Sequence, residues 1–125
     1  MEVVNIIANI QKTYAMVIGA VLVLVGILGF VPNPLVSKDG VFTVNAAQNV
    51  LHLAGGALGL WLASKGSGKA YNMWLGIIAA VVAVLGFVPG AKDLLLSLFN
   101  ITTAITVLHA AIAVVTLGVA YGVKE

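Results

Sequence analysis

Two histidines, His52 and His109, are the residues of this sequence best suited to chemistry, and both lie inside long apolar segments. A neutral imidazole can bind haem iron or another transition metal, and it exchanges protons near neutral pH. Small residues follow each histidine at helical spacing, which would leave room for a macrocycle between two helices. The pattern is compatible with a bis-histidine haem or metal site, although the chain has no arginine to bind haem propionates.

Amide and hydroxyl side chains accompany both histidines at intervals of three and four residues, so each group shares one helical face with its histidine. The polar residues on these faces are Asn45, Gln48, Asn49, Thr102 and Thr106. The face of His52 continues with three glycines that would let a neighbouring backbone approach: Gly55, Gly56 and Gly59. The plainest interpretation is structural, because such side chains form hydrogen bonds between membrane helices worth about 0.6–2 kcal/mol each. A conduction or proton pathway is a further alternative, although no acidic residue lies within an apolar segment.

Nucleophilic catalysis is not expected. The chain has no cysteine, and Ser64, Ser67 and Ser97 lie near the ends of apolar segments, far from either histidine. A serine nucleophile needs a base within hydrogen-bonding distance. We therefore expect that this protein is not an enzyme and that it binds no cofactor, unless the two histidines hold haem.

The composition points to a membrane protein. The 125-residue chain is 62% hydrophobic and 8% charged, and its mean hydropathy is +1.15, whereas soluble domains carry about 25% charged residues. So small a domain has a large surface for its volume, and so few charges cannot cover it. This excludes a soluble enzyme domain, a disordered chain and a nucleic-acid binder. The lysines are scattered and form no basic patch.

Four apolar segments are long enough to cross a bilayer as helices, since a span needs about 20 residues. They comprise residues 13–31, 44–64, 70–88 and 95–123. Pro32 and Pro89 should end the first and third segments, because proline disfavours helix in the residue before it. Lipid leaves every backbone group to be satisfied internally, so we predict an all-α bundle of four transmembrane helices. Residues 1–14 carry Glu2 ahead of any lysine and no cleavage motif, so the first segment should be a retained span.

Internal repetition is the strongest feature of the sequence. When the chain is shifted by 57 residues, 17 of the 51 positions in residues 14–64 are identical to their counterparts in residues 71–121. The matches include both histidines and an unbroken block, residues 28–32 on 85–89. We therefore predict one membrane domain, residues 1–125, made of two tandem helical hairpins. Each copy holds two spans, so both enter the membrane from the same side, which predicts a parallel repeat with its pseudo-twofold axis along the membrane normal.

Lysine placement predicts the orientation. Lysines that flank one side of the predicted spans are Lys12, Lys65, Lys69 and Lys124, and those on the other side are Lys38 and Lys92. Lysine is enriched on the cytoplasmic side of membrane proteins. We therefore expect a multi-pass protein of the inner, cytoplasmic membrane with both termini in the cytoplasm.

Parts of the sequence resemble a known family. The residues that carry the resemblance are Gly29-Phe30-Val31-Pro32, the stretch 42–53 with Asn45, Asn49 and His52-Leu53, and the small residues of 55–60. These are similar to the small four-helix prokaryotic membrane proteins grouped as domain of unknown function 4383. In the second half His109 matches, but Thr102 and Thr106 stand where the family tends to have asparagine. The resemblance covers nearly the whole chain and implies four spans in a prokaryotic membrane, and it implies no activity.

These observations favour a non-enzymatic role for the chain, as a structural or interaction protein such as an accessory subunit or a self-assembling membrane component. The alternatives are a bis-histidine haem or metal-binding electron carrier and, third, a small channel or transporter. The expected partners are the lipid bilayer and a second copy of the chain or other membrane subunits, and not nucleic acid.

Overall fold

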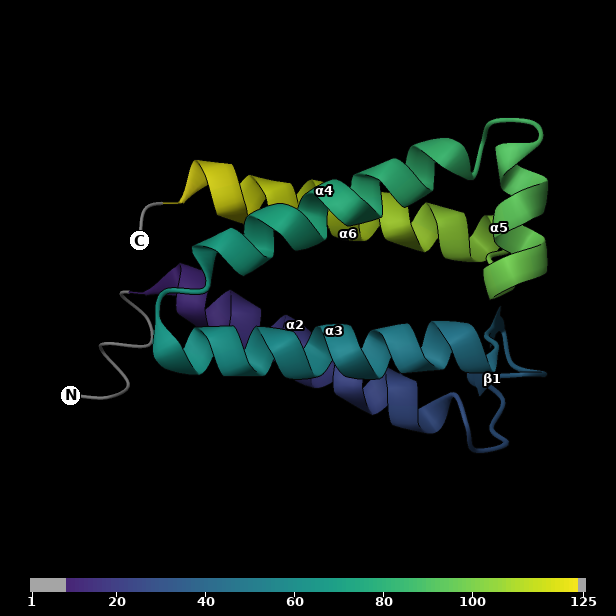
Figure 1. Cartoon of the computed structure of the whole chain (residues 1–125), viewed down its shortest axis with the longest axis horizontal. Helices are drawn as coiled ribbons and strands as arrows, with labels where there is room; N and C mark the ends of the chain where they lie inside the picture. The colour runs from purple at the N-terminus through teal and green to yellow at the C-terminus, as the bar shows by residue number, and fades with distance from the viewer. Residues whose placement is uncertain (1–8, 124–125) are drawn as a thin grey trace.

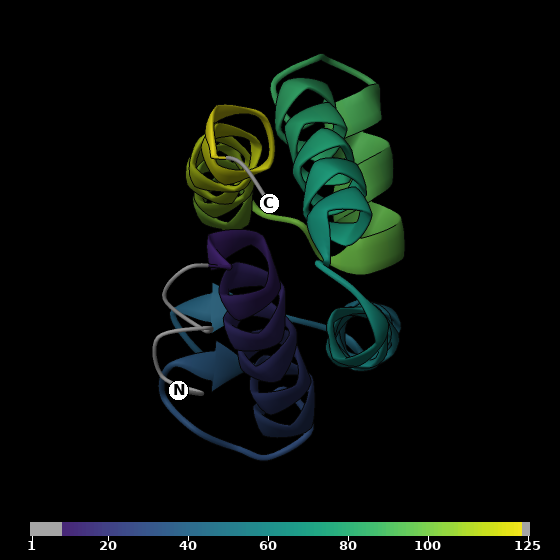
Figure 2. The ribbon, with the colours of Figure 1, turned by 90° about the vertical axis from the view of Figure 1, so that its left-hand side faces the viewer.

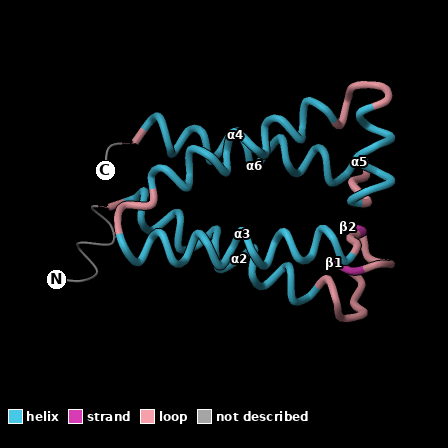
Figure 3. The backbone as a smooth tube through the Cα atoms, viewed as in Figure 1, coloured by secondary structure: helices cyan, strands magenta, loops and turns pink. Residues whose placement is uncertain are grey.

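The computed structural model describes residues 9–123, and within this range the protein is all-α with one minimal pair of strands (Figures 1 and 3). The helices are α2 (Ile10–Leu28), α3 (Ala46–Lys65), α4 (Lys69–Leu85), α5 (Ala91–Phe99) and α6 (Thr103–Gly122). The strands β1 (Val36–Ser37) and β2 (Phe42–Thr43) lie in the connection between α2 and α3 and pair in parallel, with Val36 opposite Phe42. The prediction of an all-α protein is thus confirmed.

Helices α2 and α4 end three residues earlier than the sequence predicts. We expected them to reach residues 31 and 88, but their last residues are Leu28 and Leu85. A proline ring clashes with the carbonyl of the residue four positions before it, and those residues are Leu28 for Pro32 and Leu85 for Pro89. The chain therefore leaves the α-helix there, and tighter i to i−3 backbone hydrogen bonds follow at the end of both helices.

The predicted fourth span, residues 95–123, is wrong as a continuous helix. Asn100 adopts a left-handed conformation with φ of 55° and ends α5. Thr102 then caps α6, because its Oγ1 accepts a hydrogen bond from the backbone N–H of Ile105 at 3.3 Å. Asparagine tolerates the left-handed region and threonine is a favoured helix cap. These signals mark a break inside a stretch that hydropathy alone treats as one helix.

The helices form two antiparallel hairpins that lie side by side. α2 packs along α3 and α4 packs along α6, and the end-on view in Figure 2 shows α3 and α6 on opposite corners of the four-helix arrangement. The α3–α4 turn lies at one end of the bundle, which we call the turn end, where α2 begins and α6 ends (Figure 1). The two strands and α5 lie at the other end, which we call the loop end, and α5 runs across the long helices there.

Polar and apolar side chains are distributed in this fold in the opposite way to those of a soluble protein. The largest fully buried side chains are all polar: Gln11, Asn49, Asn72, Thr106 and Thr116. Large apolar side chains are instead exposed along all the helices. Two helices, α2 and α6, are long and apolar enough to cross a membrane, with mean hydropathies of 1.8 and 2.0. Only 22% and 28% of their apolar windows are buried, so most of each window lies on the surface of the fold.

Candidate functional site in the seam between the hairpins

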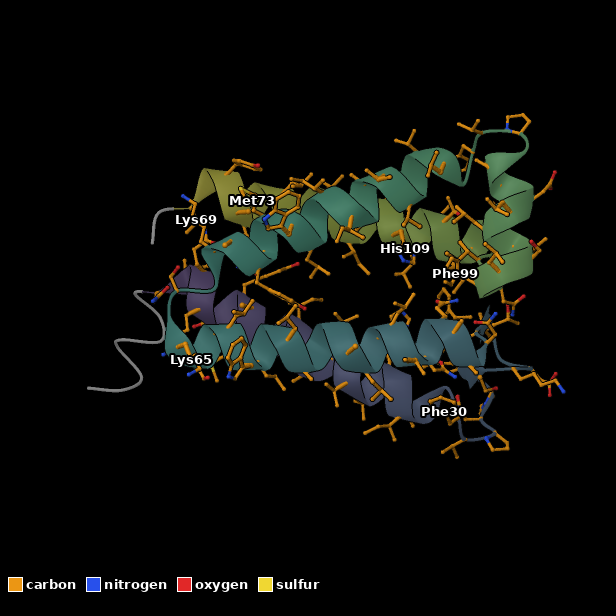
Figure 4. All side chains as sticks on the ribbon, in the orientation of Figure 1. Phe30, Lys65, Lys69, Met73, Phe99 and His109 are labelled. Carbon is orange, nitrogen blue, oxygen red and sulfur yellow. The ribbon has the colours of Figure 1, made fainter. Side chains whose placement is uncertain are left out.

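His109 projects into the seam, by which we mean the space between the α2–α3 hairpin and the α4–α6 hairpin (Figure 4). Figure 4 shows His109 extending from α6 toward the α2–α3 hairpin. Both histidines are half-buried. His109 Nδ1 donates a hydrogen bond to the carbonyl of Ile105 at 2.8 Å, which leaves Nε2 as the acceptor of the neutral ring. His52 Nδ1 is buried and has no hydrogen-bond partner among the described residues.

Buried polar side chains occupy equivalent places on α3 and α6. Asn49 is 2% exposed and its amide lies against Gly29, at a position that a Cβ on that glycine would overlap. Thr106 is 1% exposed and lies against Gly86 in the same way, and its Oγ1 donates a hydrogen bond to the Thr102 carbonyl at 3.0 Å. Each helix thus seats its polar side chain in a gap left by the glycine that ends its partner helix.

Gln48 joins the two hairpins. Its side chain is 4% exposed, and its Nε2 donates a hydrogen bond to the carbonyl of Phe99 at 2.8 Å. Phe99 is the last residue of α5, so its carbonyl is one that the helix itself leaves without a partner. The contact therefore holds the start of α3 against the end of α5.

Asn45 and Thr102 stand before the helices and not on their polar faces, which corrects the sequence-based placement. Asn45 is the N-cap of α3, where its Oδ1 accepts from the N–H of Gln48 at 2.9 Å while its Nδ2 donates to the Leu98 carbonyl at 3.1 Å. Thr102 is the N-cap of α6. Helical spacing alone cannot distinguish a residue in the first turn from the cap that precedes it.

The three glycines of α3 have different surroundings. A Cβ on Gly56 would overlap the carbonyl of Gly19 on α2, and one on Gly59 would overlap the ring of Tyr71 on α4. Gly55 is not at such a contact, since a Cβ there would meet nothing within 4 Å. Its carbonyl instead accepts a hydrogen bond from the Tyr71 hydroxyl at 2.9 Å.

A second polar group, the turn-end cluster, was not singled out from the sequence. It consists of Gln11, Tyr14, Tyr71, Asn72 and Thr116. Gln11 Nε2 donates to the carbonyls of Val119 and Val123, each at 2.7 Å. Asn72 Nδ2 donates to Gln11 Oε1 at 3.0 Å.

The two tyrosines of this cluster are interhelical residues. Tyr14 on α2 forms a hydrogen bond with Thr116 on α6. Tyr71 on α4 is only 7% exposed and contacts α3. Their sequence match at a shift of 57 residues was the signal that could have revealed this shared role, because equivalent residues of two repeats occupy equivalent contacts.

An open pocket lies at the loop end of the seam. Its volume is about 380 Å³. The residues that line it are Gly29, Phe30, Lys38, Val44, Asn45, Ala46, Asn49 and Asn100. The pocket thus combines the end of α2, the start of α3 and the residue that ends α5.

Comparison with known proteins identifies one family. The family model described as Domain of unknown function (DUF4383) matches residues 12–122, a range that takes in nearly all of the described helices. No curated protein and no solved structure matches the chain.

Proposed function

We propose that this chain, which belongs to the family described as Domain of unknown function (DUF4383), is a four-span integral membrane protein that acts as a structural or interaction component and not as an enzyme. The observation that carries this proposal is the reversed polarity of the fold. The helices turn amides and hydroxyls toward one another and turn leucine, isoleucine and valine outward. Lipid is the solvent in which this arrangement is favourable.

The two remaining long helices, α3 and α4, are compatible with crossing the membrane. α4 has 17 residues, which rise about 26 Å, and lipid accommodates a slightly short helix by local thinning at small cost. α3 has 20 residues, and its polar residues Gln48 and Asn49 lower its hydropathy. Both side chains are buried against protein, so the surface that α3 offers to lipid remains apolar.

Aromatic residues mark the two expected membrane surfaces. Trp61 and Trp74 are 56% and 59% exposed, and the ammonium of Lys65 lies 5.3 Å from the centre of the Trp61 ring. Phe30 and Phe87 are exposed near the opposite end, and Figure 4 shows Phe30 far from Lys65. Tryptophan and basic residues anchor helices at the head-group level.

Helix α5 fits an interfacial position at the loop end. It places Lys92, Asp93 and Ser97 on one face, while its leucines are mostly exposed. A short amphipathic helix that lies across the ends of spanning helices rests at the boundary of head groups and acyl chains.

The contacts within each hairpin support a parallel repeat. A shift of 57 residues moves α3 (Ala46–Lys65) onto α6 (Thr103–Gly122) without a change of length. The same shift turns the contact of Gly19 with Leu60 into that of Gly76 with Leu117. We infer that the two hairpins descend from one unit and are related by a pseudo-twofold axis along the bundle.

Contacts between the hairpins follow the same symmetry. Tyr14 contacts Thr116 of the second hairpin, and Tyr71 contacts Gly59 of the first. A shift of 57 residues relates residue 14 to residue 71 and residue 59 to residue 116. The contact of Tyr14 with position 116 is therefore the counterpart of the contact of Tyr71 with position 59. This reciprocity is typical of a twofold interface.

The distribution of lysines between the two ends of the fold supports the membrane orientation that we expected from the sequence. By their places in the elements, Lys12, Lys65 and Lys69 belong to the turn end, while Lys38 and Lys92 belong to the loop end. We propose an inner-membrane protein with the turn end in the cytoplasm. Lys124 and both chain termini lie outside the described residues.

A structural role is favoured because the described polar side chains mainly hold helices together. Gln11, Gln48 and Tyr71 each donate a hydrogen bond to a backbone carbonyl of another helix or of its end. The proposed partners are lipid and either a second copy of the chain or other membrane subunits. The scattered lysines give no surface for nucleic acid.

Fractionation and mass measurement test the proposal. The protein should remain in the membrane pellet after an alkaline carbonate wash, and it should purify in detergent as an oligomer or together with another membrane protein. Light scattering after size exclusion measures the mass of the protein component. Release by carbonate would contradict the membrane assignment, and a strict monomer that purifies alone would contradict the interaction role.

A second candidate function is a bis-histidine electron carrier, which one observation favours: the Nδ1 of His52 is buried and has no hydrogen-bond partner among the described residues. Two imidazoles on separate helices can bind haem iron from both faces. The visible absorption spectrum of the detergent-purified protein decides between the candidates. A structural protein is colourless, whereas a Soret band that is lost in His52→Leu would establish haem ligation by His52 and favour the carrier.

A further inference from the structure

One of the residues that line the loop-end pocket carries a buried polar atom that the described protein does not satisfy. Asn49 is 2% exposed, and its Oδ1 has no hydrogen-bond partner among the described residues. This oxygen is the atom nearest to where a Cβ of Gly29 would stand, and Gly29 and Asn49 both line the pocket. Leaving a buried acceptor unpaired costs about 1–3 kcal/mol. The arrangement therefore favours a ligand that brings a hydrogen-bond donor to this point.

One basic residue lines the same pocket. Lys38 lines it, and the neighbouring acid Asp39 does not. Ala46, the first residue of the 20-residue helix α3, also lines it. The cap Asn45 uses its Oδ1 for the N–H of Gln48, so the N–H groups of the first helical residues remain available. A helix N-terminus with a lysine beside it favours an anion, phosphate in particular.

The position of the pocket in the fold indicates at which depth of the membrane its ligand would lie. It lies where α2 ends and α3 begins, with the exposed ring of Phe30 at its edge. If the hairpins span the bilayer as proposed above, this is the level of the lipid head groups. An anion that reaches the pocket while its apolar part stays in the acyl region is a phospholipid.

We propose that the loop-end pocket binds the glycerol-phosphate head group of an anionic phospholipid of the phosphatidylglycerol type. Lys38 and the N-terminus of α3 bind the phosphodiester. The glycerol hydroxyl donates to Asn49 Oδ1, and the acyl chains run down the apolar surface below Phe30. This inference rests on the proposed membrane location.

Native mass spectrometry of the detergent-purified protein tests this site, with phosphatidylglycerol and phosphatidylcholine offered at equal concentration. The variants are Lys38→Gln, which removes the charge, and Asn49→Thr, which places in the pocket the residue found at the equivalent position 106. The matched control is Lys92→Gln, because Lys92 also lies at the loop end next to an aspartate but does not line the pocket.

We expect phosphatidylglycerol to bind at least tenfold more tightly than phosphatidylcholine. Lys38→Gln should weaken its binding about tenfold, because a charge-assisted hydrogen bond is lost. Asn49→Thr should weaken it severalfold, and Lys92→Gln should leave it unchanged. Equal binding of the two lipids, or equal losses in Lys38→Gln and Lys92→Gln, would overturn the proposal.

A binding measurement with free sn-glycerol 1-phosphate distinguishes a lipid head group from a water-soluble phosphate ester as the ligand. If it binds the wild type as tightly as the lipid does, a water-borne phosphate ester replaces the lipid as the ligand, and the lipid proposal is overturned. If it binds at least a hundredfold more weakly, the acyl chains contribute and the lipid is supported. The carbonate wash reports on membrane location separately, so a protein that stays in the pellet but does not discriminate lipids overturns the head-group site alone.

Discussion

At the residue scale, two glycines make the paired packing of the hairpins possible. Gly29 and Gly86 are the C-caps of α2 and α4, and each leaves the space that Asn49 or Thr106 fills. Gly29→Ala should therefore lower the free energy of unfolding by about 1–3 kcal/mol, because the new methyl group overlaps the Asn49 amide. Thermal unfolding in detergent measures this loss.

The matched control for this prediction is Gly118→Ala in α6. A Cβ at Gly118 meets nothing within 4 Å, and alanine is a better helix former than glycine by about 1 kcal/mol. Gly118→Ala should be neutral or stabilising. If both variants lose the same stability, the gap at Gly29 is not what seats Asn49.

His52 should be replaceable if its imidazole only packs in the seam. His52→Leu removes a buried nitrogen that has no partner in the described residues, so the unfolding temperature should be unchanged or raised. His109→Leu removes a hydrogen bond to Ile105 and should cost about 0.5–1 kcal/mol. A larger loss in His52→Leu than in His109→Leu would contradict the packing role and favour a ligand site.

At the element scale, the loops of the two hairpins differ although they contain the same number of residues. Asn33 organises the first loop: its Nδ2 donates to the carbonyls of Leu28 and Val36, and its Oδ1 accepts from the N–H groups of Leu35 and Val36. The equivalent residue in the second hairpin is Gly90, with φ of 87°, which is the N-cap of α5. Asn33 thus supports the strand-bearing loop with hydrogen bonds that a glycine at the equivalent position cannot form.

Asn33→Ala should loosen the first loop without unfolding the hairpin. The loss of these hydrogen bonds should cost about 1–2 kcal/mol and raise hydrogen exchange in residues 33–44, with little change in α3. Ser97→Ala is the control, because the Ser97 hydroxyl bonds only to the carbonyl of Leu94 within α5. Unchanged exchange in Asn33→Ala would contradict the organising role of this residue.

The turn-end cluster should act as one unit that links three helices. Gln11 on α2 binds α6 carbonyls while Asn72 on α4 binds Gln11. In a double-mutant cycle with Gln11→Leu and Asn72→Leu, the two losses should be non-additive by about 0.5–2 kcal/mol. Strictly additive losses would mean that the two amides stabilise the seam independently.

At the scale of the whole molecule, the proposal of four spans predicts on which side of the membrane each loop lies. The chain has no cysteine, so single introduced cysteines can test this topology. Single cysteines at Asp39 and Asp93 should be labelled by a membrane-impermeant maleimide in intact cells, because both loops lie at the loop end. A cysteine at Ser67, in the α3–α4 turn, should be labelled only after the membrane is opened. Labelling of all positions from one side would contradict the four-span proposal.

Much of the architecture could be predicted from the sequence. Hydropathy located the apolar segments, and the prolines located the ends of α2 and α4 to within one turn, since both effects are local. The break at Asn100 could not be found in this way, because the surrounding leucines are as apolar as those of a continuous span. For the candidate site, helical spacing placed Gln48, Asn49 and His52 correctly on one helix, but it could not identify their partners.

The sequence by itself determined that this chain is helical, apolar on its outer surfaces and internally repeated. Composition and self-similarity are counted directly from the residues, and a proline affects only the helix in which it lies, so none of these features requires the tertiary structure. Only the tertiary structure decided which buried polar groups are satisfied. Gln11 finds its acceptor at Val119, over a hundred residues away, while Asn49 Oδ1 and His52 Nδ1 find none in the described chain. Whether a side chain finds such a partner depends on the positions of the backbone carbonyls of other helices, and these positions are fixed only when the two hairpins pack.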